Sequence, residues 1–313
     1  MGLVPGDSRT GRPAFYPPTG SIFRMEASPA GAGSVGGMPV TRRAARLKRA
    51  LAELPSIVYW EGRHVVRAAR RFLLPVRWCR VGGVRVALVV SSSSEHYRAD
   101  TYATKEPETI EWLRARLEDD DVLFDVGANV GLYSLYAAKL RPGCRVYAFE
   151  PESHSFSSLT RNILVNRLEN VTPCSLALSD RESFELFHVY GQEPGSALHS
   201  LGAPSELRSE PPTIRQGTVA TTLDRLVFSH GLPHPTLLKI DVDGIEERIL
   251  DGAGAMLASG KVRSILVEVT RRGEAETTWA ERRLAAFGYS LTARSAWTIE
   301  LRGLRSQNYV FDR

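Results

Sequence analysis

Apolar and polar positions follow a regular order from Glu106 to the C-terminus. Short apolar runs, which predict strands, are separated by stretches in which apolar residues recur at helical spacing. The predicted strands are residues 122–126, 145–150, 171–176, 237–242 and 264–269, and the predicted helices are residues 130–140, 153–166, 245–257 and 278–287. Alternating strands and helices indicate βαβ units, so we expect an α/β fold with a mostly parallel sheet and helices on both faces.

Two segments of this region depart from the alternation. Residues 289–293 and 308–311 predict an antiparallel hairpin that closes the edge of the sheet. Residues 181–216 hold a β-rich piece followed by a loop rich in Gly, Pro and Ser. A long insertion of this kind is typically either functional or disordered.

The first 105 residues have a different character. Residues 1–38 are rich in Gly, Pro, Ser and Ala and predict a flexible tail. Residues 41–74 predict two basic amphipathic helices, which either present a solvated face or bind an anionic membrane surface or acidic partner. Residues 81–90 predict two strands joined by a glycine turn. The expected division is therefore a tail (1–38), a basic helical and β extension (39–105) and a main domain (106–313).

Composition narrows the class of protein. Hydrophobic residues make up 43% and charged residues 24% of the chain, as in ordinary globular proteins. A net charge of +5 is too small to indicate nucleic-acid binding. The chain has neither an apolar run long enough for a membrane span nor a secretory signal pattern, and its three cysteines lack metal-site spacing. We therefore expect a cytoplasmic protein, able to bind peripherally to a membrane through residues 41–74, with no metal.

A glycine turn follows the first predicted strand of the main domain. The sequence runs Val122-Leu-Phe-Asp-Val-Gly-Ala-Asn-Val-Gly131, and the next strand ends in Glu150. A strand, a glycine turn, a helix, a strand and an acid in this order are typical of a nucleotide site, in which the acid accepts hydrogen bonds from ribose hydroxyls. The alternative is that the glycines only permit tight strand-to-helix packing. Because GxGxxG and P-loop motifs are absent, NAD and ATP are disfavoured, and Asp125 suits an amino group or sulfonium.

Several ordered blocks resemble the FkbM family of methyltransferases. They are Asp125-Val-Gly-Ala-Asn-Val-Gly131, Ala148-Phe-Glu-Pro151, Ala177-Leu-Ser-Asp180 and Leu238-Lys-Ile-Asp-Val-Asp-Gly244 followed by Glu246. The resemblance covers roughly residues 107–311. It implies a Rossmann-like class I methyltransferase fold that binds S-adenosyl-L-methionine and methylates a hydroxyl of a sugar, glycan or other small natural product.

The resemblance also implies roles for individual residues. The methionine part of the cofactor would be lined by Asp125, Gly127, Asn129 and Gly131, the ribose held by Glu150, and the adenine placed beside Asp180. The block around Asp243 departs from the family, which more often has Glu there. The shorter side chain keeps the charge but reduces its reach.

The chemistry predicts where catalytic groups lie. Methyl transfer is an in-line displacement, so the enzyme aligns the hydroxyl with the methyl group and removes a proton. Asp241, Asp243 and Glu246 follow the fourth strand and are the candidate catalytic residues, with Asp241 the first choice. Asp243 is equally explained as a helix cap.

Three further side chains have two interpretations each. Lys239 is either exposed or the charge partner of Asp241. Glu268 either contacts substrate or pairs with Arg271 or Arg272. His199, in the insertion, is either an ordinary surface histidine or a base.

Two other functions compete with methylation of a small molecule. One is a methyltransferase acting on a macromolecule, although the Asp-Val-Asp-Gly block at Asp241 stands where adenine N-methyltransferases have NPPY or DPPY. The other is a binding or scaffold protein that keeps the fold and is anchored by its basic helices. The oligomeric state is left open.

Overall fold

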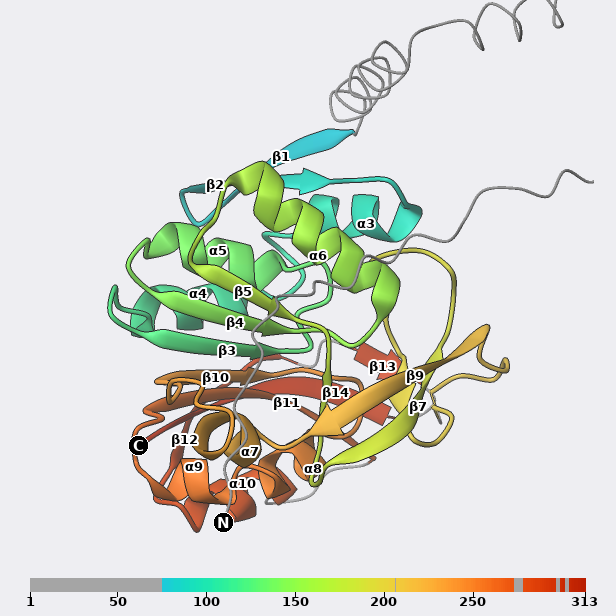
Figure 1. Ribbon diagram of the computed structural model, residues 1–313. Coiled ribbons are helices and arrows are strands. Elements are labelled where there is room, and N and C mark those ends of the chain that lie inside the picture. Colours follow the sequence, from blue (N-terminus) through green and yellow to red (C-terminus); the bar gives the residue numbers. More distant parts are fainter. Residues whose placement is uncertain (1–74, 206, 273–277, 297–298, 302–303) are drawn as a thin grey trace, which may run out of the picture. The chain divides into compact units, whose positions relative to one another are not determined.

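The computed structural model describes residues 75–205, 207–272, 278–296, 299–301 and 304–313 (Figure 1). The tail predicted for residues 1–38 and the basic helices predicted for residues 41–74 lie outside the described residues. The described residues all belong to one compact unit. No helix among them is long and apolar enough to cross a bilayer.

The main sheet has the strand order β12, β14, β11, β10, β3, β4, β5. The strands are β3 Val122–Val126, β4 Arg145–Phe149, β5 Val171–Cys174, β10 Leu237–Ile240, β11 Ser264–Arg272, β12 Ser290–Arg294 and β14 Leu304–Asp312, with β13 Ile299–Leu301 paired to β14. The five strands from β5 to β11 are parallel, whereas β14 and β12 run antiparallel to their neighbours. The predicted mostly parallel sheet and its antiparallel C-terminal pair are confirmed.

Helices cover both faces of this sheet (Figure 1). On one face lie α4 Pro107–Arg116, α5 Leu132–Leu140 and α6 Ser153–Asn166, and on the other lie α7 Leu223–Phe228, α8 Glu246–Asp251, α9 Gly254–Ala258 and α10 Trp279–Ala285. Successive residues of a strand point to opposite faces, so Leu123 joins the first hydrophobic core and Phe124 the second. Burial on both faces explains why β3 is apolar at nearly every position.

The single helix predicted for residues 245–257 is wrong. The chain forms α8 and α9 instead, with a break at Gly252 and Ala253. A Cβ at Gly252 would lie 2.2 Å from the carbonyl oxygen of Ser179, so the chain turns where it touches another segment. The carboxylate of Asp224 then accepts hydrogen bonds from two backbone N–H groups in the first turn of α9.

The insertion at residues 181–216 contributes to a second sheet. Its order is β6 Ala177–Leu178, β9 Ile214–Thr221, β7 Ser183–Val189 and β8 Ser200–Leu201. The predicted β-rich piece is β7, and the short strand β8, which follows it in the chain, pairs with it. Gln216 donates a hydrogen bond to the carbonyl of Pro151, which ties this sheet to the end of β4.

A hairpin and a helix precede the main domain. The strands β1 Val76–Val81 and β2 Val84–Val89 turn at Gly82 and Gly83, and α3 Ser93–Thr101 follows. Asn162 of α6 accepts a hydrogen bond from the N–H of Val89, which fixes β2 on that helix. The division of the chain at residue 105 stays a prediction.

Candidate active site

The strand order reverses between β3 and β10, because the chain moves outward to β5 before it returns to β10. In open α/β sheets the crevice at such a switch point, beyond the carboxyl ends of the strands, is the usual ligand site. The N–H of Asp241, after β10, donates to Val126 O of β3 at 3.1 Å. The turn at Gly127 and the acids after β10 therefore lie side by side.

The two glycines of the turn are required for different reasons. Both have positive φ angles, 80° at Gly127 and 90° at Gly131. A Cβ at Gly127 would lie 1.9 Å from the carbonyl oxygen of Asp241, and one at Gly131 would lie 2.5 Å from Leu159. Gly127 also lines the crevice, whereas Gly131 does not. For Gly131 the structure shows tight packing against Leu159, and its contact with the cofactor stays a prediction.

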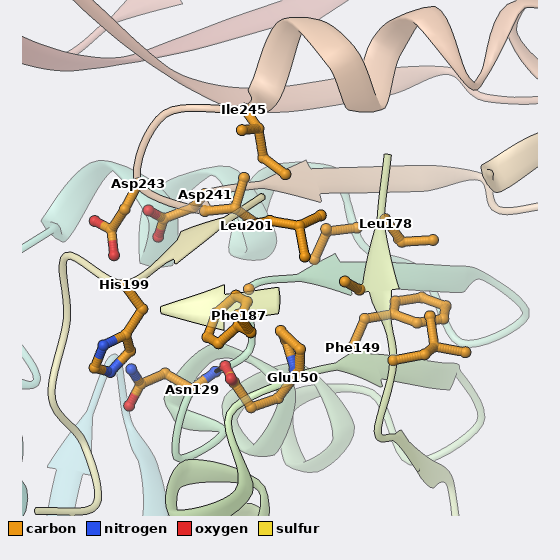
Figure 2. A pocket seen from close by; sticks show the side chains of 16 residues that line it. Asn129, Phe149, Glu150, Leu178, Phe187, His199, Leu201, Asp241, Asp243 and Ile245 are labelled. Atoms are coloured by element: carbon orange, nitrogen blue, oxygen red, sulfur yellow. Dashed lines mark hydrogen bonds between the residues drawn. The ribbon is translucent and has the colours of Figure 1, made fainter. Parts of the chain in front are cut away.

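One part of the crevice is a slot with an apolar end and a polar end (Figure 2). Phe149, Leu178, Leu201 and Ile245 are among its apolar lining residues. Asp180, predicted beside adenine, does not line the slot. Its carboxylate accepts a hydrogen bond from Nε of Arg248 at 3.0 Å instead. The apolar end suits a flat base held by dispersion and burial.

Glu150 lies in the slot at the end of β4 and is 5% exposed. Its two carboxylate oxygens accept hydrogen bonds from the N–H groups of Asn129, at 2.8 Å, and Glu152, at 2.7 Å. Burial raises the pKa of Glu150 to about 7, although these two bonds lower it. Each oxygen retains a lone pair for a further donor.

The polar end of the slot carries Asn129, which was predicted to line the cofactor site, and His199, for which two interpretations were left open. The amide nitrogen of Asn129 donates to the carbonyl of Ser196, so this residue binds the insertion to the glycine turn. His199 is buried, and its Nδ1 accepts a hydrogen bond from the N–H of Tyr190 at 3.0 Å. Burial lowers the pKa of His199 to about 4, so the ring is neutral at physiological pH. The interpretation as an ordinary surface histidine is wrong.

The slot opens beside a second cavity of about 760 Å³, here called the polar cavity. Charged and hydroxyl-bearing side chains from distant parts of the chain line it: Arg98, Lys105, Glu106, Tyr133, Tyr190, Glu193, Arg208, Glu210, Lys239, Asp241, Asp243 and Glu268. Gly127, Asn129, Asp241 and Asp243 line both the slot and the polar cavity. They mark the place where the two meet.

Lys239 contributes to the wall of the polar cavity, as Asp241 does, and is only 1% exposed. Its Nζ lies 2.9 Å from Oδ2 of Asp241 and 3.5 Å from Oδ1 of Asp125. Of its two interpretations, the structure therefore shows the charge partner. Asp125 is fully buried, accepts a hydrogen bond from Ser134 and lines neither cavity. In this structure it pairs with Lys239.

The three candidate catalytic residues have different surroundings. Burial would raise the pKa of Asp241, but the charges of Lys239 and Lys105 outweigh it and lower that pKa. Burial and the neighbouring Asp241 raise the pKa of Asp243 to about 6. Both side chains lie in the crevice, as predicted.

Asp243 and Glu246 differ in what they hold. Asp243 has a φ of 60°, and its Oδ2 accepts a hydrogen bond from the N–H of Leu198 at 2.6 Å. Since α8 has Ile245 at its N-cap, the capping interpretation of Asp243 is wrong. Glu246 accepts hydrogen bonds from the N–H groups of Gly244 and Val242 and lines neither cavity. In this structure Glu246 fixes the loop that carries the two aspartates, and its catalytic role stays a prediction.

Sequence reasoning missed one wall of the polar cavity. Lys105 pairs with Glu106 at 2.6 Å, and Glu106 accepts a hydrogen bond from the hydroxyl of Tyr133 at 2.7 Å. Arg98 of α3 donates from Nε to the carbonyl of Gly195. No motif marks these residues, because they come from α3, from the segment before α4 and from α5, and meet only in the folded chain.

Glu268 lies in the polar cavity near the middle of β11. Burial and the nearby acids Asp241, Glu246 and Asp243 raise its pKa well above the usual value. The alternative pairing with Arg271 or Arg272 concerns side chains outside those described. Among the described residues, no three His, Cys, Asp or Glu side chains gather in a way that would hold a metal ion.

Residues 125–291 match the model of the methyltransferase FkbM domain, which is more than half of the chain. The chain belongs to the FkbM methyltransferase family. This confirms the resemblance seen in the sequence, the class I methyltransferase fold and S-adenosylmethionine as the methyl donor of the domain. The roles of individual residues stay predictions.

Two curated relatives with methyltransferase names are similar to this chain. The 31-O-demethyl-FK506 methyltransferase FkbM of Streptomyces tacrolimicus is 32% identical over an alignment of 159 residues, with coverage of 44% of this chain and 60% of that protein. The hexuronic acid methyltransferase AglP of Haloferax volcanii is 31% identical over 193 residues, covering 60% and 72%. The solved methyltransferase FkbM of Methylobacillus flagellatus KT is 14% identical, with a TM-score of 0.40 and coverage of 70% and 56%.

The described residues fit S-adenosylmethionine. The apolar end of the slot suits adenine, and the buried carboxylate of Glu150 has lone pairs for ribose hydroxyls. Gly127 and Asn129 line the passage from the slot to the polar cavity, where the methionine part would continue. Asp241 supplies a negative charge there for the amino group or sulfonium.

Proposed function

We propose that the protein methylates a hydroxyl oxygen of a polar, polyhydroxylated small molecule, such as a sugar or glycan, with S-adenosylmethionine as donor. The observation that carries this proposal is that Asp241 and Asp243 line both the slot and the polar cavity. A group bound in one cavity and an acceptor bound in the other would meet beside two carboxylates. That arrangement suits a transfer that needs alignment and removal of one proton.

The bound donor supplies an electrophilic methyl group on a sulfonium. The chain's own part is to position the acceptor and take its proton. Asp243 is the better base of the pair, because a pKa of about 6 leaves it mostly ionised at pH 7 yet more basic than an ordinary aspartate. Its Oδ2 is occupied by the N–H of Leu198, which leaves Oδ1 for the hydroxyl.

Asp241 has a different role in this mechanism. Lys239 holds it ionised and fixes one of its oxygens at 2.9 Å. A carboxylate with a lowered pKa is a weak base, but it stays ionised and can therefore bind a positive charge or a hydrogen-bond donor. We therefore assign Asp241 to orientation of the acceptor or of the donor's ammonium group, and proton removal to Asp243.

The lining of the polar cavity supports the class of acceptor. It offers acceptors at Glu106 and Asp243, cationic donors at Arg98 and Lys105, and a carboxyl at Glu268 whose raised pKa favours the protonated, hydrogen-bond-donating form. A molecule with many hydroxyl groups satisfies such a mixed set, whereas an apolar acceptor would leave it unpaired. The name of the Haloferax relative, a hexuronic acid methyltransferase, agrees with this class.

The test is a turnover assay on purified protein with S-adenosylmethionine and a panel of free sugars, uronic acids and sugar nucleotides. Release of S-adenosylhomocysteine and a gain of one methylene in the acceptor's mass are measured together. Asp243→Asn should lower kcat by about 10²- to 10⁴-fold, the usual contribution of a general base. Asp120→Asn, at an exposed position outside both cavities, is the matched control and should leave kcat unchanged.

Two results would contradict the proposal. One is methylation at nitrogen or carbon with no hydroxyl acceptor turned over. The other is an Asp243→Asn variant that turns over a hydroxyl acceptor as fast as the wild type. The second result would leave oxygen methylation standing and return the role of base to Asp241.

A further inference from the structure

His199 is the only residue in the slot whose ring nitrogen is buried without a hydrogen-bond partner among the described residues. The unpartnered atom is Nε2, and the residue as a whole is 6% exposed. A buried polar atom without a partner costs free energy, so an atom of this kind that lines a cavity indicates a missing ligand.

The other ring nitrogen fixes where the proton lies. Nδ1 of His199 accepts the N–H of Tyr190 at 3.0 Å, so it must be unprotonated. In a neutral imidazole the proton is then on Nε2. The free nitrogen is therefore a hydrogen-bond donor, and it cannot take a proton from a substrate. This excludes the alternative that His199 acts as a general base.

The position of the ring indicates which ligand atom it meets. His199 lines the slot but not the polar cavity, so it faces the cofactor and not the acceptor. Figure 2 shows His199, Asn129 and Glu150 toward one end of the slot, with Phe149 and Leu178 at the other. The base would occupy the apolar end, which leaves the sugar between Glu150 and His199.

We infer that His199 donates a hydrogen bond from Nε2 to a ribose hydroxyl oxygen of the bound S-adenosyl compound, as the counterpart of Glu150. The two residues are complementary in chemistry. Glu150 only accepts hydrogen bonds when ionised, and the neutral ring of His199 has only a donor left. A hydroxyl group can donate to the carboxylate and accept from the ring at the same time. This inference rests on the proposed function, because it assumes that the slot holds the nucleoside.

Hydrogen bonds of neighbouring residues fix the loop that carries His199. His199 lies next to Leu198, whose N–H is bonded to Asp243, and the same loop is bonded through Ser196 to Asn129. Further along, Gly195 accepts a hydrogen bond from Arg98 of α3. His199 is thus a positioning residue that the insertion delivers to the cofactor, whereas the glycine turn and Glu150 come from the core of the fold.

Two conservative variants separate the donor role from a purely structural one. In His199→Gln the terminal amide nitrogen can replace Nε2, but the acceptor for Tyr190 is lost. In His199→Asn the amide oxygen can replace Nδ1, but the Nε2 donor is lost. Binding of S-adenosylhomocysteine, 2′-deoxy-S-adenosylhomocysteine and 3′-deoxy-S-adenosylhomocysteine to each protein is measured by calorimetry.

The inference predicts that His199→Asn binds S-adenosylhomocysteine about tenfold more weakly, as expected for one lost hydrogen bond. His199→Gln should stay within about threefold of the wild type. In the wild type, removing the contacted hydroxyl should cost more affinity than it does in His199→Asn. A purely structural role would give the opposite order, with Asn tolerated and Gln impaired.

A measurement on the wild type is independent of how the variants fold. In protein labelled with ¹⁵N-histidine, the resonances of His199 are assigned as those absent from His199→Gln. Nε2 should appear protonated and Nδ1 unprotonated, and the Nε2 proton should shift on saturation with S-adenosylhomocysteine. An unprotonated Nε2, an unshifted proton, or equal deoxy penalties in wild type and His199→Asn would each overturn the inference.

The same experiments distinguish the inference from the proposed function. Binding of S-adenosylhomocysteine with the expected His199 pattern, but without transfer to any hydroxyl acceptor, would refute the proposed acceptor and keep the ribose contact. Failure of the folded wild type to bind S-adenosylhomocysteine would overturn both.

Discussion

Replacing Lys239 by Met should destabilise the protein and make the loss depend on pH. Lys239 is 1% exposed, and its Nζ lies 2.9 Å from Asp241 and 3.5 Å from Asp125. Methionine is close in length and apolar, so the change removes the charge with little change in packing. It leaves two carboxylates at a buried site without their cation. Removing one partner of a buried charge pair costs about 3 to 5 kcal/mol in the free energy of unfolding.

We expect the lower end of that range. The attraction between Lys239 and Asp241 is about 6 kcal/mol at an effective dielectric constant of 20. The desolvation of the ammonium group, several kcal/mol, offsets much of it and disappears with the lysine. Asp241 also keeps some contact with water, since its side chain is 26% exposed. A loss of about 3 kcal/mol at pH 7.5 is therefore expected.

The direction of the pH effect follows from Asp241. In the wild type its pKa is lowered, so its contribution to stability is present above the unfolded pKa of about 3.9 and is lost only as the pH falls through the lower folded value. In the variant, burial raises that pKa with less to oppose it. The variant then loses stability as the pH rises through the raised value. The difference between the two proteins should grow by about 1 kcal/mol or more between pH 4.5 and pH 7.5.

Urea unfolding followed by far-ultraviolet circular dichroism measures both quantities. With a slope of about 3 kcal/mol/M, the midpoint of the variant should fall by about 1 M at pH 7.5. Lys261→Met, at an exposed position, is the control and should change stability by no more than about 0.5 kcal/mol. A loss below about 1 kcal/mol, or the same loss at both pH values, would refute the reasoning that Lys239 is the buried countercharge that lowers the pKa of Asp241.

Three further outcomes follow from the site. Because the pKa of Glu150 is about 7, affinity for S-adenosylhomocysteine should rise from pH 6 to pH 8 as the carboxylate ionises, and Glu150→Gln should flatten that part of the calorimetric profile. Gly127→Ala places a Cβ at 1.9 Å from a backbone oxygen and should abolish binding or folding. Gly83→Ala, at a φ of 87° with open space around it, should cost only about 1 kcal/mol in thermal unfolding, and similar effects of the two would contradict the steric argument. Asn162→Ala removes two buried hydrogen bonds, one to β2 and one to the glycine turn, and should lower the free energy of unfolding by about 2 to 3 kcal/mol. An unchanged midpoint in urea would show that these bonds do not stabilise the protein.

The sequence predicts best those parts of the site whose residues lie close together in the chain. The strand before Asp125, the turn at Gly127 and the acid at Glu150 stand at fixed spacing along one βαβ unit, so the order of residue types indicates the geometry. The helix at Ser153–Asn166 was predicted with its observed bounds for the same reason, since its apolar spacing and its start are local features.

The features that the sequence does not indicate depend on contacts that form only in the folded chain. Asp180 accepts a hydrogen bond from Arg248, which is 68 residues away in the chain. The sequence block that contains Asp180 therefore does not indicate that its side chain lies outside the slot. The break in the predicted helix at Gly252 depends on the carbonyl of Ser179. Glu246 looks catalytic because it follows two aspartates, and only the course of the loop shows that its carboxylate turns back to backbone N–H groups.

The hydrogen bonds between α3 and the insertion have a consequence for how such enzymes diversify. Ser92 donates to the carbonyl of Pro194, the N–H of Ser94 donates to Glu193, and Arg98 donates to Gly195. The first of these segments precedes the residues that match the family, and the second lies within them. Exchange of either segment alone between relatives would leave some of these hydrogen-bonding groups without their partners. We therefore expect acceptor preference to change only when both segments are exchanged together. The glycine turn and Glu150, which are proposed to hold the cofactor, can stay the same.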